Sequence, residues 1–161
     1  MRVGELVEIR RAELADCAAI ASVLFEAFVE FKPLYTDRGF AATTPDAQQI
    51  GIRMREGPVW VALRDAVTIG TASAVQKSES IYIRGMAVVP GARGSGAGSR
   101  LLGKIESWAE AEKGTRLFLS TTPFLGSAIR LYERAGFRRI PDEPHNLFGT
   151  PLFTMEKVIG R

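Results

Sequence analysis

The sequence predicts a single α/β (α+β) domain with six to seven strands and about four helices. Short segments with alternating apolar residues are interleaved along the chain with segments whose apolar residues recur at helical spacing. The chain has 161 residues, enough for one hydrophobic core and too few for two comfortable ones. No internal repeat or linker divides residues 1–161, so we expect one domain.

The N-terminal third is predicted to hold one strand and two helices. Glu5–Ala12 alternates apolar and polar residues, as a half-buried strand does. Glu13–Phe31 has the apolar stripe of an amphipathic helix, and Lys32–Pro45 is expected to be a loop because it is rich in helix breakers. Thr44 is expected to cap a second helix, with the proline that follows at its first position, running to Glu56.

The middle of the chain is predicted to form three strands. Val59–Asp65 and Val67–Gln76 are expected to pair as an antiparallel hairpin, and Ser80–Val89 forms a third strand that stops before a proline. Gly85 lies inside this third strand, where a glycine indicates a bulge or a close backbone approach.

The C-terminal half is predicted to alternate helices and strands. The expected elements are a helix from Ser95 or Gly96 to about Lys113 ended by Gly114, a strand at Arg116–Thr121, a helix in Leu125–Phe137 ended by Gly136, a short strand at Arg138–Ile140, a loop at Pro141–Thr150 and a last strand at Thr150–Ile159.

Composition and charge exclude several classes of function. Hydrophobic residues make up 46% of the chain and charged residues 24%, as in an ordered globular protein. The net charge of +3 is modest and dispersed, so no nucleic-acid partner is expected. No apolar run approaches the roughly 20 residues of a membrane span, and the charged N-terminal segment does not resemble a signal peptide. A single cysteine, Cys17, suits a reducing cytoplasm, and with a single histidine no metal site is expected.

Four glycines within Gly91–Gly98, between a predicted strand and a predicted helix, indicate a phosphate-binding loop. Helix N-termini expose unpaired N–H groups, and glycine lets the backbone approach a ligand closely. A P-loop would need a lysine after Gly98, and a dinucleotide fingerprint would need its third glycine at Ser99 or Leu101; both are absent. The stretch RGSGAG, Arg93–Gly98, instead fits the pattern Arg/Gln-x-x-Gly-x-Gly/Ala.

This loop and a second motif resemble the hallmarks of the GNAT superfamily of acyl-CoA-dependent N-acyltransferases. The loop follows MAVVP, Met86–Pro90, and the second motif, AIRLYERAGFRRI at Ala128–Ile140, has the family's form A-x-x-L-Y-x-x-x-G-F. Together, in this order, they disfavour the alternative of a merely flexible glycine-rich turn. The resemblance covers roughly residues 7–137. It implies a GNAT-like domain with a mixed, mostly antiparallel central sheet flanked by helices.

The resemblance also implies acetyl-CoA as co-substrate and assigns its binding residues. In the family, backbone N–H groups at the end of the fourth strand bind the pantetheine arm and polarise the thioester carbonyl, and the loop wraps the pyrophosphate. The matching residues are Met86, Ala87, Val88, Arg93, Gly94, Ser95, Gly96, Ala97, Gly98 and Ser99. Arg93, Arg100 or Arg130 are further candidates for phosphate contacts.

Tyr132 is the expected catalytic acid, because the family's tyrosine at this position commonly protonates the departing thiolate. The alternative is a tyrosine that packs on the core with its hydroxyl at the rim. The general base is left open: the strand position where some members carry glutamate is Tyr82, and Glu30 and Glu79 are more typical of exposed charges. The single histidine, His145, falls in a predicted loop and is left outside the catalytic set.

Two further positions concern contacts to the ligands. The family often has an asparagine three residues before the alanine of the second motif, where this chain has Leu125, so one polar contact to the cofactor is in doubt. On the acceptor side, Tyr35 and Phe40 are candidate walls, and Glu30 and Asp37 are candidate partners for a cation.

These observations predict an N-acetyltransferase that moves the acetyl group of acetyl-CoA to a primary amine of a small molecule or peptide. The amine attacks directly, and backbone groups stabilise the oxyanion. The alternative is a non-catalytic acyl-CoA-binding or sensor module of the same fold. The resemblance also allows a homodimer, and neither a membrane nor a nucleic acid is an expected partner.

Overall fold

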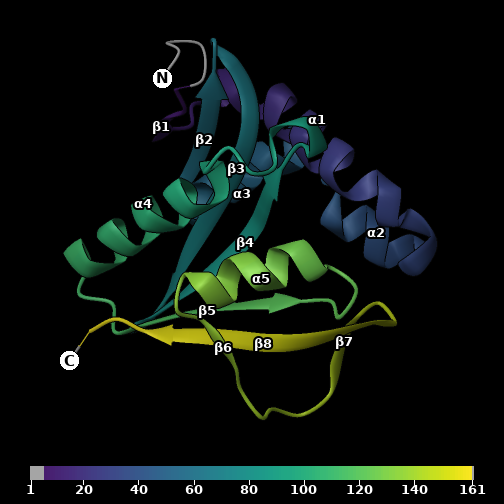
Figure 1. Cartoon of the computed structure of the whole chain (residues 1–161), viewed down its shortest axis with the longest axis vertical. Helices are drawn as coiled ribbons and strands as arrows, with labels where there is room; N and C mark the ends of the chain where they lie inside the picture. Colours follow the sequence, from purple (N-terminus) through teal and green to yellow (C-terminus); the bar gives the residue numbers. More distant parts are fainter. Residues whose placement is uncertain (1–5, 161) are drawn as a thin grey trace.

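An eight-stranded sheet forms the centre of the computed structural model, which describes residues 6–160 (Figure 1). The spatial order is β1-β2-β3-β4-β5-β8-β6, and β7 pairs with β8 off this path. The strands are β1 (Glu8–Arg11), β2 (Val59–Arg64), β3 (Val67–Lys77), β4 (Ser80–Val88), β5 (Arg116–Thr121), β6 (Arg138–Arg139), β7 (His145–Leu147) and β8 (Thr150–Val158). All pairs are antiparallel except β4 with β5, which confirms the mixed, mostly antiparallel sheet with one strand more than expected.

Among residues 6–160, five α-helices flank this sheet, one more than expected. They are α1 (Cys17–Phe28), α2 (Asp37–Thr43), α3 (Ala47–Glu56), α4 (Ala97–Ala111) and α5 (Gly126–Arg134), with short 3₁₀ helices η2 (Leu14–Asp16), η3 (Val29–Leu34) and η4 (Pro90–Ala92). Within the described part of the chain, none of the helices is long and apolar enough to cross a membrane.

The helices cover the two faces of the sheet, as expected from the alternation of apolar side chains along its strands. On one face, Ile20 and Leu24 of α1 and Ile50 of α3 are buried against β2. On the other, Leu101 and Ile105 of α4 are buried in a core that includes side chains of β4, β5 and β8. Figure 1 shows α4 and α5 together in front of the sheet, with α1 and α3 behind it.

Strands β4 and β5 separate part-way along their length (Figure 1). They pair in parallel only where Ser80–Tyr82 faces Arg116–Phe118; beyond this, β4 follows β3 and β5 follows β8. Gly85, with φ +60°, forms the predicted bulge, because the β3–β4 register shifts by one residue there. We call the opening between residues 83–88 and 119–121 the fork. It leaves the edge of β4 that faces β5 without ladder bonds to it.

The segment Lys32–Pro45 was predicted to be a loop, and this prediction is wrong. It contains the end of η3 and all of α2. Thr36 caps α2, because its Oγ1 accepts a hydrogen bond from the backbone N–H of Gly39 at 3.0 Å. Thr36 is itself held by Thr150, whose Oγ1 accepts from the Thr36 N–H at 3.0 Å. This partner lies 114 residues away, so no local pattern could reveal it.

The predicted cap of the following helix is also corrected. Asp46, not Thr44, caps α3: Asp46 Oδ1 accepts from the N–H of Gln49 at 2.9 Å, and Gln49 Oε1 accepts from the N–H of Asp46 at 2.9 Å. This reciprocal pair is a capping box. Thr44 instead ends α2, donating its hydroxyl to the carbonyl of Phe40 at 2.9 Å.

Other boundaries also differ from those predicted. Helix α4 ends at Ala111, and Lys113 rather than Gly114 takes the left-handed conformation, at φ +62°. The predicted loop Pro141–Thr150 contains β7, which joins β8 through a turn at Phe148 and Gly149, both with positive φ. Phenylalanine is unusual at positive φ, so the sequence lacks a hairpin signal there. Glu5, the start of the first predicted strand, lies outside the described residues.

Candidate functional site

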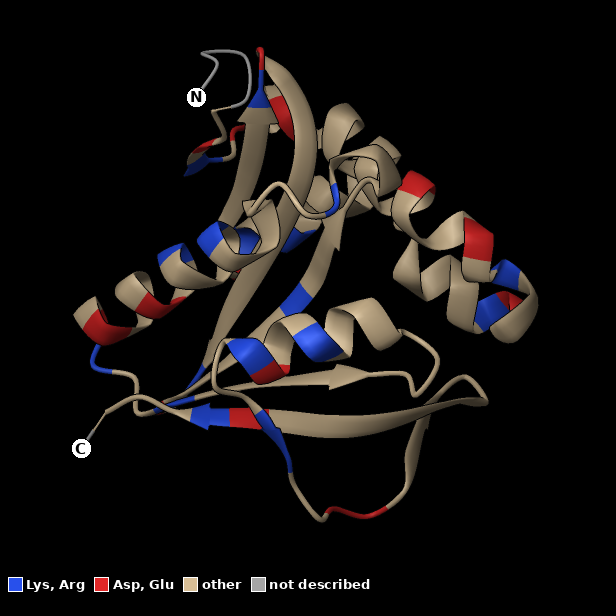
Figure 2. Ribbon diagram, in the orientation of Figure 1, with Lys and Arg blue, Asp and Glu red and all other residues tan. Residues whose placement is uncertain are grey.

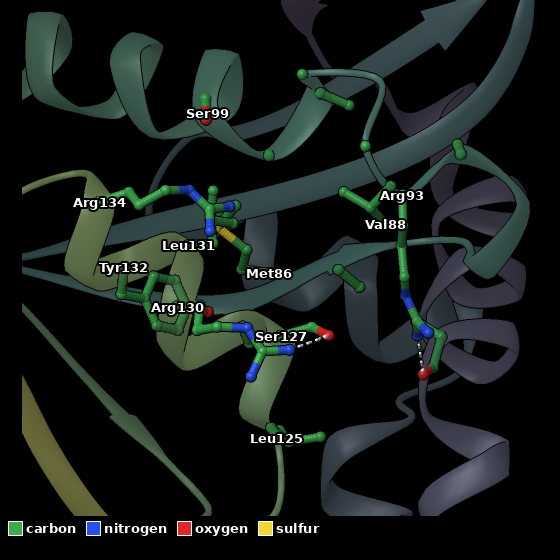
Figure 3. Close-up of a pocket in the computed structure, with 18 of the residues that line it drawn as sticks. Met86, Val88, Arg93, Ser99, Leu125, Ser127, Arg130, Leu131, Tyr132 and Arg134 are labelled. Atoms are coloured by element: carbon green, nitrogen blue, oxygen red, sulfur yellow. Dashed lines mark hydrogen bonds between the residues drawn. The ribbon is translucent and has the colours of Figure 1, made fainter.

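A cavity of about 480 Å³ opens at the fork, between the N-terminal turn of α4 and helix α5 (Figure 3). Its floor is the end of β4, and the end of α1 and η3 close it with Ala27, Phe28 and Phe31. Helix α5 contributes apolar and basic side chains to the opposite wall. Small-molecule sites commonly have volumes of about 300–1,000 Å³ and this mixture of apolar walls and a few charged groups.

Nine of the ten predicted cofactor-binding residues line this cavity; Ser95 is the exception. Gly94 and Gly96 take φ values of +84° and +88°, and a Cβ at either would have no atom within 4 Å. Gly96, the N-cap residue of α4, has no side chain, and the N–H groups of Gly98 and Ser99 in the first turn have no partner among the described residues, so they remain open to a ligand. The Ser95 hydroxyl accepts a hydrogen bond at 3.3 Å from the N–H of Ala97, the first residue of α4, so this N–H is not open to a ligand.

The first turn of α4 packs directly against α5 at Gly98. A Cβ at this position would lie 2.7 Å from Cδ2 of Leu131. Such a separation is far below an ordinary carbon–carbon contact. Gly98 therefore permits the close approach by which both helices line one cavity.

Arg93 does not point at the open part of the cavity. Its Nη1 lies 2.8 Å from Oε1 of Glu30, and its Nη2 donates to the carbonyl of Ala27 at 3.3 Å. Figure 3 shows the side chain running from the loop toward the end of α1. Arg93 thus anchors the glycine loop to the end of α1 and to η3, and Glu30 has its cation partner within the chain.

Two arginines of α5 lie on the cavity wall, one turn apart. Arg130, a predicted candidate, donates to Oγ of Ser127 at 3.3 Å, and Arg134 was missed by sequence analysis. Arg134 could have been found from the sequence, because residues four apart lie on the same side of a helix and Arg134 follows Arg130 at this spacing in the second motif. Arg100, the other candidate, is not among the lining residues.

The charges along α4 also favour an anion at its start. Arg100 and Lys104 lie in the first half of the helix, and Glu106 and Glu110 lie in the second. Figure 2 shows this separation along the helix, with further basic segments on α5 beside it. The helix dipole favours negative side chains at the start of a helix and positive side chains at its end, which is the opposite of the order in α4. Stabilisation of the helix therefore does not explain this arrangement.

Tyr132 of α5 lines the cavity with only 7% of its surface exposed. Its ring packs 5.9 Å from that of Phe137, centre to centre. Burial raises the pKa of the Tyr132 phenol well above its usual value, with a smaller contribution from Tyr35. The phenol therefore keeps its proton at neutral pH, and its O–H is available as a hydrogen-bond donor in the cavity.

The opposite face of the fork, on the side of α1 and α3, carries a different set of side chains; we call it the far face. The rings of Tyr82 and Phe118 stack there at 5.2 Å. Because side chains alternate along a strand, Arg84 and Ser120 are the next residues on this face, where the strands separate. Glu79 precedes β4 in the turn after β3, at the other end of the strand.

Ser120, His145 and Asp142 form a contiguous polar group on the far face. His145 Nε2 lies 3.3 Å from Oγ of Ser120, and Nδ1 lies 3.5 Å from Oδ2 of Asp142 and 3.3 Å from the carbonyl of Glu143. Two acceptors around Nδ1 indicate that the neutral ring carries its proton there, so Nε2 can accept from Ser120. His145 is thus held on strand β7 rather than in a loop; sequence analysis gave no signal for this contact.

Comparison with known proteins identifies the family. The sequence profile of the acetyltransferase (GNAT) family matches residues 20–137. The chain belongs to the GNAT family. The uncharacterized N-acetyltransferase YjgM of Escherichia coli K12 is 28% identical over 137 residues, covering 81% of each chain.

Two solved structures show the same GNAT fold. The ribosomal-protein-alanine N-acetyltransferase from Brucella melitensis is similar with a TM-score of 0.74 and 26% identity, over 94% of this chain and 99% of that one. PaiA N-acetyltransferase from Thermoplasma acidophilum, in complex with coenzyme A, has a TM-score of 0.80 and 16% identity, over 95% and 99% of the two chains. The predicted resemblance and the fold that it implied are therefore confirmed.

Within this GNAT domain, Tyr35 and Phe40, the candidate walls of the acceptor site, are buried in an aromatic cluster. Tyr35 and Phe40 are 8% and 7% exposed, and their rings pack 6.0 Å apart. The ring of Phe124 completes this aromatic cluster, 4.9 Å from Tyr35. The cluster supports η3 and α2 and does not line the cavity. Asp37 lies in the first turn of α2, also away from the cavity lining.

The departure at Leu125 has a local consequence. Leu125 is the N-cap residue of α5 and makes no side-chain hydrogen bond to the helix. Its side chain lines the cavity instead, where the family often has a polar amide.

Proposed function

We propose that this GNAT domain is an N-acetyltransferase that transfers the acetyl group of acetyl-CoA to a primary amine of a small molecule or peptide. One observation carries the proposal: the glycine loop, the open start of α4 and the protonated phenol of Tyr132 meet in one cavity at the fork. That the PaiA structure holds coenzyme A supports the choice of cofactor. We treat residues 1–161 as one functional unit.

The residues of the cavity fit an acyl-CoA. The loop Gly94–Ser99, which includes the start of α4, would hold the pyrophosphate, because no side chain fills the space at Gly94 or Gly96. Among residues 6–160, the N–H groups of Gly96, Gly98 and Ser99 have no hydrogen-bond partner, so they are available to an anion. Arg130 and Arg134 would add charge-assisted contacts from α5. The pantetheine arm would follow the free edge of β4 at Met86–Val88.

When bound, acetyl-CoA supplies a reactive thioester. The amine nitrogen of the acceptor attacks the thioester carbonyl carbon, so that a C–N bond forms and the C–S bond breaks. Backbone N–H groups at Met86–Val88 would stabilise the negative charge that develops on the carbonyl oxygen. Tyr132 would donate its proton to the departing sulfur and recover one from solvent.

The amine must also lose a proton, and His145 is our candidate to receive it. Ser120 would accept the proton from the amine while its own hydroxyl proton moves to Nε2 of His145. Asp142 and the carbonyl of Glu143 face Nδ1 and would stabilise the resulting imidazolium. This would supply a base at the fork, whereas the strand position at which some family members carry a glutamate is Tyr82.

Release of free thiol from acetyl-CoA in the presence of a panel of primary amines tests this function. Mass spectrometry of the same samples must show the acetylated amine. We expect both signals from the wild type and a large loss of both from Tyr132→Phe. The competing proposal, a non-catalytic acyl-CoA-binding module, predicts acetyl-CoA binding with no thiol release from any amine.

A further inference from the structure

Two arginines meet on the far face, directly behind the bulge of β4. Arg84 precedes Gly85 on the strand, and Nη1 of Arg53, from α3, lies 3.1 Å from the point where a Cβ on Gly85 would stand. Burial lowers the pKa of Arg53, and the charge of Arg84 lowers it further. The two guanidinium groups are therefore close enough to repel each other.

The two arginines carry two positive charges, and only one of the two is in an ion pair with a carboxylate among residues 6–160. Glu56 forms an ion pair with Arg84. Arg53 makes no ion pair with any residue between 6 and 160, and its hydrogen bond to the carbonyl of Ala42 is long, at 3.4 Å. In addition, Nε of Arg84 is buried with no hydrogen-bond partner. Buried donors without partners are rare and costly, and at a binding site they indicate a missing acceptor group.

The pair lies beside the place where the acceptor must react. Arg84 is two residues before Met86, so their Cα atoms are separated by at most about 7 Å along the strand. Ser120, our candidate to accept the proton of the amine, lies on the other arm of the fork on the same face. Both arginines therefore lie on the face of the fork from which Ser120 would receive the proton of the amine.

We propose that the acceptor is a primary amine that also carries a carboxylate, as free amino acids do, and that Arg53 and Arg84 bind this carboxylate. The planar guanidinium donors match the two oxygens of a carboxylate. An acceptor with a second positive charge would need a free carboxylate to bind it. Such an acceptor is disfavoured, because Glu30, one of the expected partners for a cation, is already paired with Arg93. The inference rests on the proposed acetyl transfer and names its substrate class.

Matched acceptor pairs test the inference. The probes are the standard amino acids and their carboxamides, which differ only in the carboxylate, together with propylamine. We expect at least one amino acid to exceed its amide in kcat/KM by about tenfold to a hundredfold, as expected for hydrogen bonds to a charged group. Arg53→Met keeps much of the side-chain stem and removes the charge, so it should abolish this preference by raising KM for the acid alone.

A control and a binding measurement separate recognition from damage to the fold. Arg55 is exposed on the same helix, so Arg55→Met should retain the wild-type preference. Calorimetric titration of the preferred amino acid into protein saturated with coenzyme A should give binding by the wild type and Arg55→Met and none by Arg53→Met. Binding of acetyl-CoA should be equal in all three.

Several results would overturn the inference. Equal or better acetylation of the amides or of propylamine would do so and would leave the acetyltransferase function standing. An unchanged acid preference in folded Arg53→Met would remove the role of the arginine pair. If acetyl-CoA binds but no amine of any kind is acetylated, the inference and the transferase function both fail.

Discussion

The imidazole Nε2 of His145 lies 3.3 Å from the hydroxyl oxygen of Ser120, at the point where β4 and β5 separate. The carboxylate of Asp142 faces the other ring nitrogen and also accepts a hydrogen bond from the hydroxyl of Thr154 at 2.6 Å. Strand β8 thus fixes the carboxylate, and the carboxylate orients the ring. Such an ordered group can move a proton away from an amine at the fork.

His145→Gln should therefore lower kcat by about a hundredfold, within the range that general-base catalysis contributes. Affinity for acetyl-CoA should be unchanged, because His145 does not line the cavity. Asp142→Asn should have a smaller effect, since it removes only the orienting charge. Steady-state kinetics at saturating acetyl-CoA measure both variants. A kcat for His145→Gln equal to that of the wild type would exclude the histidine as the base.

Tyr132→Phe should lower kcat by about tenfold to a hundredfold without weakening acetyl-CoA binding. Burial disfavours the phenolate and so raises the pKa of Tyr132 above its usual value of about 10. The phenol consequently stays protonated as the pH rises through neutral and mildly alkaline values. In a pH–rate profile of the wild type we expect no fall between about pH 8 and 10 from this group. An alkaline limb that disappears in Tyr132→Phe would contradict this assignment.

Gly98→Val should lower the free energy of unfolding by about 1–3 kcal/mol, because the added carbons would overlap Leu131 of α5. Gly103 is the matched control: it lies in the same helix, and a Cβ there meets no atom within 4 Å. Gly103→Val should be close to neutral, since valine is a slightly better helix former than glycine. Urea denaturation measures both. Equal destabilisation by the two substitutions would refute the close contact of α4 with α5.

Asp16→Asn should destabilise the protein at neutral pH and have little effect at low pH. Arg10 donates two hydrogen bonds to Asp16, at 2.8 and 3.0 Å, and these lower the pKa of the Asp16 carboxyl. A lowered folded-state pKa stabilises the fold above the unfolded pKa of about 3.9, and this contribution is lost as the pH falls through the folded value. With Arg10 partly exposed, we expect about 1 kcal/mol at pH 7. Urea unfolding at pH 7 and near pH 3 would show whether the difference shrinks.

Much of the fold could be predicted from the sequence because local chemistry determines it. β5 covers the same residues as predicted, Arg116–Thr121, since its apolar run is bounded by turn residues. Gly136, at φ +101°, follows α5 as its motif indicates. The loop Arg93–Gly98 could be recognised because glycine is the residue that most readily adopts positive φ, so its glycines indicate the backbone conformation.

The acceptor side could not be predicted, because its contacts join residues far apart in the chain. Arg53 and Arg84 are brought together only when α3 packs beneath β4, and Ser120 meets His145 only once β7 pairs with β8. No spacing rule connects such pairs. Arg93 was a candidate for a phosphate contact because of its residue type and its position in the loop. In the structure its guanidinium instead forms an ion pair with Glu30 and donates to the carbonyl of Ala27, contacts that no local pattern predicts.

Binding of acetyl-CoA at the start of α4 is the central claim, and isothermal titration calorimetry tests it most directly. Ser99 lies in the first turn of α4 on the cavity wall, whereas Ser107 is exposed on the same helix outside it. Ser99→Glu adds a negative charge where we place the pyrophosphate, and Ser107→Glu adds the same charge elsewhere. We predict tight binding by the wild type and Ser107→Glu, and loss of binding by a folded Ser99→Glu. Equal binding by all three proteins, or no binding by the wild type, would contradict the assignment of this cavity to the cofactor.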